Sequence, residues 1–156
     1  MAFDTSEIKN PPVGVPVVLV VTSAKVKKSA AKKDPKTQKP AGGHTFISLG
    51  TRVAEGEGVG ASLFHSIWVT HGQDKGKTAA WRNQAVTDVS NILGYTPEII
   101  PSEVGEDTDA MQKLPGSAFE AILKFEPAKG DYPEGIRIKR IVGAVTLQVE
   151  DNDSNF

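Results

Sequence analysis

The sequence predicts an all-β fold with one helix: a small five-stranded barrel in which the helix lies between the third and fourth strands. A valine-rich run at residues 13–26 favours a strand, because β-branched side chains lose rotamer freedom in a helix. Apolar and polar residues alternate, as in half-buried strands, over residues 44–55, 62–69, 117–125 and 136–142. With 156 residues, 38% of them hydrophobic, the chain has the size and composition of one globular domain.

The second and third expected strands each divide into an apolar face and a mixed face. In residues 44–55 the apolar face consists of Ile47, Leu49, Thr51 and Val53, and the other face carries Phe46, Ser48 and Arg52. In residues 62–69 the apolar face consists of Leu63, Ile67 and Val69, and the other face carries Phe64, Ser66 and Trp68. The alternation alone leaves open which face of residues 62–69 meets water.

Helical spacing appears once, over residues 79–93, where Trp81, Ala85 and Val89 recur on one face. Thr78 is the expected N-cap, and Gly94 stands where a helix commonly ends. The acidic segment 95–116 has little periodicity and predicts a long loop with at most one helical turn.

The last two expected strands complete the domain. In residues 117–125, Phe119 and Phe125 share a face with Leu123, which predicts that both rings are core. The alternation of residues 136–142 can be followed to residue 149. We therefore expect one domain over residues 1–149 and an acidic C-terminal tail over residues 150–156.

Charge is strongly polarised along the chain, although the net charge is only −1. A basic loop is expected at residues 25–43, where seven lysines face the single acidic residue Asp34. These lysines are Lys25, Lys27, Lys28, Lys32, Lys33, Lys36 and Lys39. The local charge of +6 leaves −7 for the rest of the chain. Lysines near phosphates release counterions, so the segment indicates a nucleic-acid partner, although a run of charge is more often only a solvated loop.

The order of three strands, a helix and two strands is that of an OB-fold barrel. OB-folds bind oligonucleotides on strands two and three and through the loops that join strands one to two and four to five. The basic loop is the first of these connections, and Lys129, Tyr132 and Arg137 lie in or beside the second. We therefore expect single-stranded DNA binding, with lysines on the backbone and strand aromatics stacked on bases.

The expected DNA-binding residues combine the basic loop, the mixed strand faces and two further basic segments. They are Lys25, Lys27, Lys28, Lys32, Lys33, Lys36, Lys39, Phe46, Arg52, Phe64, Trp68, Lys75, Lys77, Tyr132, Arg137 and Lys139. In the tail, Asp151, Asp153 and Phe156 are expected to compete for the basic surface and to dock partner proteins, although a frayed terminus is an equal alternative.

No catalytic constellation is found, and we expect neither an enzyme nor a bound cofactor or metal. The chain has no cysteine. The segment GQDKGKT at residues 72–78 resembles a phosphate-binding loop, but His71 occupies the position where that motif needs its first glycine. His44, His65 and His71 show no metal-ligand spacing and are expected to be ordinary surface or strand histidines.

The sequence also favours a cytoplasmic protein. No apolar run approaches the roughly 20 residues of a membrane span. The first twelve residues, MAFDTSEIKNPP, lack the basic and then apolar order of a signal peptide.

Several segments resemble the phage-encoded single-stranded DNA-binding proteins of the OB-fold type. These are TFISLGTRVAEGEGVGASLFHSIWV, AAWRNQAVTDVSNILG, FEAILKFEPAKGDYPEGIRIKRIVGA and the acidic tail that ends in Phe156. The resemblance implies a protein that coats exposed strands during replication, recombination or repair and recruits replication proteins through its tail. The tail departs from the usual pattern, because it has only three acidic side chains.

Two other functions remain open from the sequence. One is a structural or assembly protein of a phage or virion, with the lysine segment as a disordered arm that contacts another chain. The other is an RNA-binding module of similar fold. A homodimer is also open, since OB barrels leave strand edges that can pair with a second copy.

Overall fold

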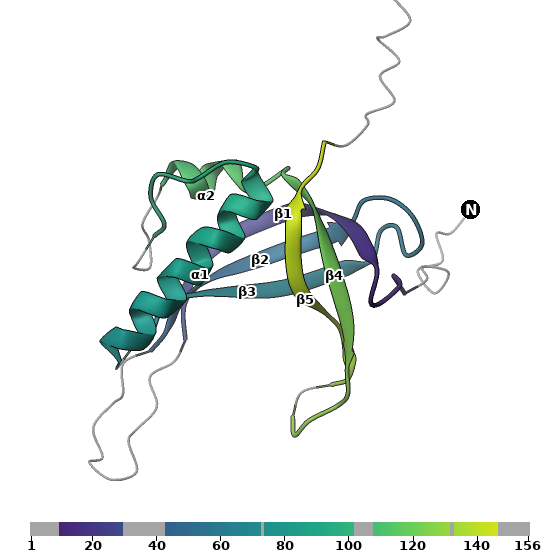
Figure 1. The fold of residues 1–156 in the computed structure, drawn as a ribbon. Coiled ribbons are helices and arrows are strands. Elements are labelled where there is room, and N and C mark those ends of the chain that lie inside the picture. The colour runs from purple at the N-terminus through teal and green to yellow at the C-terminus, as the bar shows by residue number, and fades with distance from the viewer. Residues whose placement is uncertain (1–9, 30–42, 73, 102–107, 132, 147–156) are drawn as a thin grey trace, which may run out of the picture.

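A computed structural model describes residues 10–29, 43–72, 74–101, 108–131 and 133–146 (Figure 1). Five antiparallel strands form one sheet in the order β3-β2-β1-β4-β5. The strands are β1 Pro16–Lys28, β2 Thr45–Val53, β3 Ser62–Thr70, β4 Ala118–Glu126 and β5 Gly135–Ala144. Two helices, α1 Lys75–Leu93 and α2 Asp109–Lys113, lie between β3 and β4 in the chain. The prediction of a mostly β fold with a helix at this point is confirmed.

The sheet is open, with β3 and β5 as its two edges. These edges approach each other, but no hydrogen-bonded ladder joins them within the described residues. Figure 1 shows α1 crossing one face of the sheet, and α1 contacts β3, β4 and β5. In the described part of the chain, no helix is long and apolar enough to cross a membrane.

The core lies between the sheet and the two helices. The strands contribute alternate side chains from one face, and α1 contributes a stripe at helical spacing. Fully buried members include Leu19, Ile47, Leu49, Ile67, Val69, Val89, Ile92, Leu114, Phe119 and Leu123. The apolar faces predicted for residues 44–55 and 62–69 are therefore the inner faces of β2 and β3.

The start of α1 differs from the sequence prediction. Helix α1 begins at Lys75 and not at residue 79, and its N-cap is Asp74 and not Thr78. The Asp74 carboxylate accepts a hydrogen bond from the backbone N–H of Lys77 at 3.1 Å, which satisfies one of the free donors of the first turn. The same bond holds the pKa of Asp74 below its ordinary value. The predicted polar turn at residues 72–78 is therefore wrong from Lys75 onward, whereas the predicted end at Gly94 is confirmed, with φ at +80°.

Two further predictions need correction. Phe125 is not core: its side chain is 56% exposed, because the hairpin of β4 and β5 extends beyond the body of the sheet (Figure 1). The segment 95–116 contains the five-residue helix α2, little more than the single helical turn allowed for it, so the described residues form two helices and not the one expected. Thr108 caps α2 by accepting a hydrogen bond from the Met111 N–H.

A β-bulge in β1 decides which way the strand's lysines point. Val21 pairs with Thr51 of β2 but Ser23 pairs with Gly50, so Thr22 is an extra residue. Before the bulge, Val17, Leu19 and Val21 face the core, and after it Ala24 and Val26 do. Lys25 and Lys27 therefore point away from the core, whereas an unbroken alternation would turn both inward.

Three lysines of the predicted basic loop belong to a strand instead. Lys25, Lys27 and Lys28 belong to β1, which ends at Lys28. After Lys28, Ser29 and His44 bond reciprocally: the Ser29 N–H donates to the His44 carbonyl, and the His44 N–H donates to the Ser29 hydroxyl. Lys32, Lys33, Lys36 and Lys39 lie outside the described residues.

One histidine is held against α1 inside the fold. His65 of β3 is half-buried, and burial lowers the pKa of its imidazole below the ordinary value of 6.5, while the charge of Asp88 on α1 raises it partly back. Burial also raises the pKa of Asp88 above its ordinary 3.8, against a hydrogen bond from Gln84.

This burial predicts acid-sensitive stability. The unfolded chain protonates His65 at a higher pH than the folded chain does, so lowering the pH below about 6.5 favours unfolding. We expect the free energy of unfolding, measured by urea denaturation between about pH 7.5 and 5.5, to fall more steeply in the parent protein than in His65→Gln. Equal pH dependence in the two proteins would contradict the assignment.

Candidate functional site

The face of β1, β2 and β3 that points away from the core, called here the outer face, brings together most of the described residues that the sequence singled out. Its aromatic members are Phe46 on β2 and Phe64 and Trp68 on β3. The exposed fraction is 75% for Phe64 and 42% for Trp68. Phe64, Ser66 and Trp68 therefore lie on the solvent-facing side of β3, which the sequence alone left open.

Two of the three aromatic side chains of the outer face are neighbours across the β2–β3 ladder. Phe46 pairs with Trp68, and their ring centroids lie 4.9 Å apart at an interplanar angle of 47°. Phe64 pairs with Gly50, which has no side chain to cover the ring. A Cβ at Gly50 would lie 2.5 Å from the Ser23 Oγ beside the bulge, so this position favours glycine. The outer face therefore presents flat apolar groups to solvent.

Cations flank these rings on β1 and β2, and carboxylates are absent from all three strands. Lys27 pairs with Phe46 and Lys25 pairs with Ser48 across the β1–β2 ladder, and Arg52 is exposed near the far end of β2. None of the residues in β1, β2 and β3 is Asp or Glu, although the whole chain has 19 acidic residues. The outer face is therefore positively charged in a chain of negative net charge.

At one end of the outer face the aromatic contacts continue onto α1. We call the set His44, Phe46, Trp68, His71 and Trp81 the ring cluster. The Trp68 and Trp81 centroids are 5.7 Å apart, and Trp81 lies 4.9 Å from His71 and 5.2 Å from His44. His44 also meets the Trp68 ring edge-on at 6.0 Å and the His71 ring at 4.3 Å. The cluster joins the ends of β2 and β3 to the second turn of α1.

Hydrogen bonds fix the two imidazoles of the ring cluster. His44 Nδ1 accepts from the Gly72 N–H at 3.0 Å, and His71 Nδ1 accepts from the Asp74 N–H at 3.1 Å. The Thr78 hydroxyl accepts from the His71 N–H at 3.0 Å and donates to the His71 carbonyl at 3.1 Å. Gly72 and Asp74, between β3 and α1, are thereby hydrogen-bonded to the imidazoles of His44 and His71.

The sequence predictions missed this cluster. Trp81 was expected only to share an apolar face of the helix with Ala85 and Val89. It is half-buried against rings, and the fully buried residues of α1 are Ala85, Val89 and Ile92. His44 and His71 were expected to be ordinary histidines. The glycine turn of residues 56–60 was a signal in the sequence. A hairpin centred on that turn pairs Thr45 with Thr70 and therefore brings residues 44 and 71 together.

The other predicted site residues lie away from the centre of the outer face. Lys28 is exposed at the end of β1, and Lys75 and Lys77 are exposed in the first turn of α1. Lys139 is exposed at a bulge of β5. Arg137 donates from Nη1 to the Ile136 carbonyl at 3.3 Å and from Nη2 to the Pro133 carbonyl at 3.5 Å. These bonds stabilise the start of β5. Four predicted residues besides the loop lysines lie outside the described residues: Tyr132, Asp151, Asp153 and Phe156.

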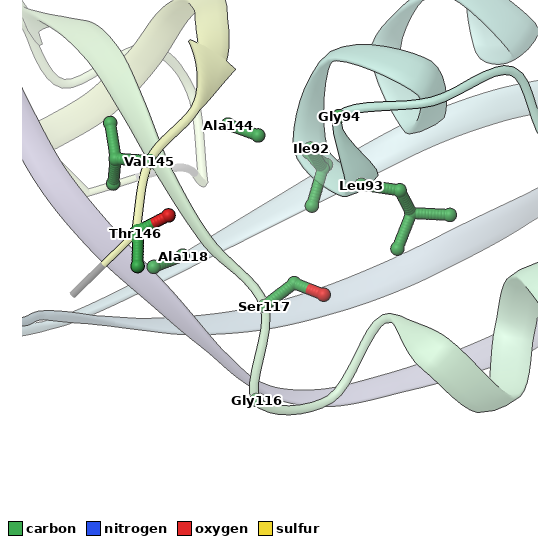
Figure 2. A pocket seen from close by; sticks show the side chains of 9 residues that line it. All are labelled: Ile92, Leu93, Gly94, Gly116, Ser117, Ala118, Ala144, Val145 and Thr146. Atoms are coloured by element: carbon green, nitrogen blue, oxygen red, sulfur yellow. The ribbon is translucent and has the colours of Figure 1, made fainter.

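A separate groove of about 580 Å³ lies where α1 ends. Figure 2 shows Ile92 and Leu93 of α1 on one side of it, with Val145 and Thr146 on the other. Its remaining lining residues are Gly94, Gly116, Ser117, Ala118 and Ala144, so the lining carries no charged side chain. Within the described residues, no group of three or more His, Asp or Glu side chains is arranged to hold a metal ion.

No protein-family model matches the chain, and no curated protein matches it.

Phe119 in the core and Phe64 on the outer face should contribute very different amounts to the free energy of unfolding. Phe119→Ala removes a fully buried ring and should lower the free energy of unfolding by about 3–5 kcal/mol. Phe64→Ala removes a ring that is 75% exposed and should change it by less than about 0.5 kcal/mol. Urea denaturation of the two variants measures both values, and a large loss in Phe64→Ala would show that this ring supports the fold.

Proposed function

We propose that the protein binds single-stranded DNA on its outer face with little sequence preference, as a coating protein in replication, recombination or repair. Lys25, Lys27 and Arg52 would neutralise phosphates, and Phe46, Phe64 and Trp68 would stack on bases. The acidic tail that ends in Phe156 would dock replication or recombination proteins. The mode of action is binding and not catalysis.

The observation that carries the proposal is the exposure of Phe64 and Trp68 on the face of β3 that points away from the core. Large apolar groups gathered on a surface commonly mark a site of interaction. Flat rings suit a nucleobase, because every base has a π-face and stacking on an aromatic side chain contributes about 1–3 kcal/mol per base. This mode of contact reads no base edge, so it tolerates any sequence.

Charge favours a polyanion as the ligand. The three strands of the outer face carry Lys25, Lys27, Lys28 and Arg52 and no acidic residue. Cations beside exposed rings are complementary to a single-stranded polynucleotide, in which each charged phosphate is followed by a base that can stack. A duplex offers phosphates, but its bases are already stacked on one another, so we expect preference for single strands.

We further propose that the sheet is an OB-type barrel, open between β3 and β5. Closing a sheet of order β3-β2-β1-β4-β5 would bring β3 beside β5, and these two edges already approach each other. The helix between β3 and β4 and the rings on β2 and β3 also agree with the oligonucleotide-binding arrangement of that fold.

The proposal predicts two separable losses in binding. Phe64→Ala combined with Trp68→Ala should weaken binding of an oligothymidylate by about 10-fold or more at any salt concentration, because stacking is lost. Lys25→Gln combined with Lys27→Gln should reduce the slope of log affinity against log salt by about 1.4, because two phosphate contacts are lost. Fluorescence anisotropy of a labelled oligonucleotide measures both effects.

Tyr95→Ala with Lys113→Gln is the matched control, since it removes an exposed aromatic side chain and a lysine from outside the outer face. The control should bind like the parent protein, and RNA and duplex DNA serve as competitors. If all three double variants bound equally well, the outer face would not be the binding site. Stronger competition by RNA than by DNA would make the protein an RNA-binding module.

A further inference from the structure

We propose that the bound strand continues past the end of β3 onto α1, where Trp81 provides a further stacking ring between two groups of lysines. This inference rests on the proposed function and assigns to DNA binding three residues of the ring cluster, Trp81, His44 and His71, that the sequence did not single out for it. The ligand at this extension is one or more additional nucleotides of the same single strand.

Continuity of the rings is the first argument. Trp68, which is 42% exposed on the outer face, has its centroid 5.7 Å from that of Trp81. Such a separation is typical of aromatic neighbours that form one packed surface. Trp81 is half-buried, so the residue is still partly accessible to solvent. A strand that stacks on Trp68 therefore meets a second indole directly beyond it.

Preorganisation is the second argument. His44, directly before β2, and His71, directly after β3, contact Trp81, and each Nδ1 is held by a backbone N–H, from Gly72 and from Asp74. Thr78 holds the His71 backbone from the first turn of α1. A ring held in this way loses little conformational freedom when a base stacks on it, which lowers the entropic cost of binding. His44 and His71 are thus positioning residues for the two tryptophans.

The placement of cations is the third argument. Lys77 precedes Trp81 by four residues on α1, so the two side chains lie one turn apart on the same side of the helix. Lys75 is also exposed in that first turn. On the other flank, Lys27 pairs with Phe46 and Lys28 pairs with Thr45, next to His44. Phosphates on either side of a base at Trp81 would therefore meet lysines from two different elements.

The two tryptophans of the chain allow a direct test. Trp81→Phe leaves Trp68 as the only tryptophan, and Trp68→Phe leaves Trp81. Each variant is titrated with oligothymidylates of about 4 to 16 nucleotides, and quenching of the remaining tryptophan is followed. We expect Trp68 to be quenched by shorter oligonucleotides than Trp81, because the strand reaches Trp81 only after it has covered the outer face.

A lysine pair provides the second readout. Lys75→Gln combined with Lys77→Gln should leave the affinity for the shortest bound oligonucleotide unchanged. For the longest oligonucleotides the same substitutions should weaken binding several-fold and lower the slope of log affinity against log salt by about 1.4. Lys113→Gln is the matched control on α2 and should change neither value.

The outcomes separate this inference from the function on which it rests. Quenching of Trp68 with no response of Trp81 at any length, and no effect of the Lys75 and Lys77 substitutions, would overturn the extension and leave binding on the outer face intact. No quenching of either tryptophan, together with unchanged oligonucleotide anisotropy, would overturn both. Length-dependent quenching of Trp81 that requires the two lysines is the result that the inference predicts.

Discussion

The extra residue at Thr22 is the constraint on which the surface chemistry of this fold depends. A β-strand places successive side chains on opposite faces, so a single inserted residue reverses every later one. In β1 that reversal keeps Val17, Leu19 and Val21 in the core and turns Lys25 and Lys27 toward solvent. The same strand thereby supports the core at one end and supplies charge to the outer face at the other. Gly50 accommodates the bulge, because it leaves room for the Ser23 side chain.

The ring cluster links this surface to the helical layer. Helix α1 buries Ala85, Val89 and Ile92 against the inner face of the sheet, yet Trp81, one turn earlier, meets Trp68 from the outer face. The contact is made at the end of the sheet, where His71 follows β3 and Asp74 caps the start of α1. One helix therefore stabilises the core with its later turns and extends the exposed aromatic surface with its second turn.

Much of the fold could be predicted because apolar periodicity reports burial directly. The five strands, the long helix and its end at Gly94 follow from local patterns and agree with the structure to within a few residues. Two predictions failed for different reasons. The hairpin of β4 and β5 extends beyond the core and exposes Phe125, which is a tertiary feature. The start of α1 was placed too late because Asp74 is a local cap earlier in the chain than Thr78. His44, His71 and Trp81 were missed because their contacts join three elements, and only the pairing of β2 with β3 brings the two histidines together.

The most direct test of the outer face as the ligand surface is an amide map by ¹H–¹⁵N NMR during titration with a short oligothymidylate, with a duplex of matched length as the control. The account predicts that the largest shift changes fall on Lys25, Lys27, Phe64 and the Trp68 indole N–H, and that the duplex causes much smaller ones. Changes confined to the groove around Ile92, with the outer face unaffected, would contradict it.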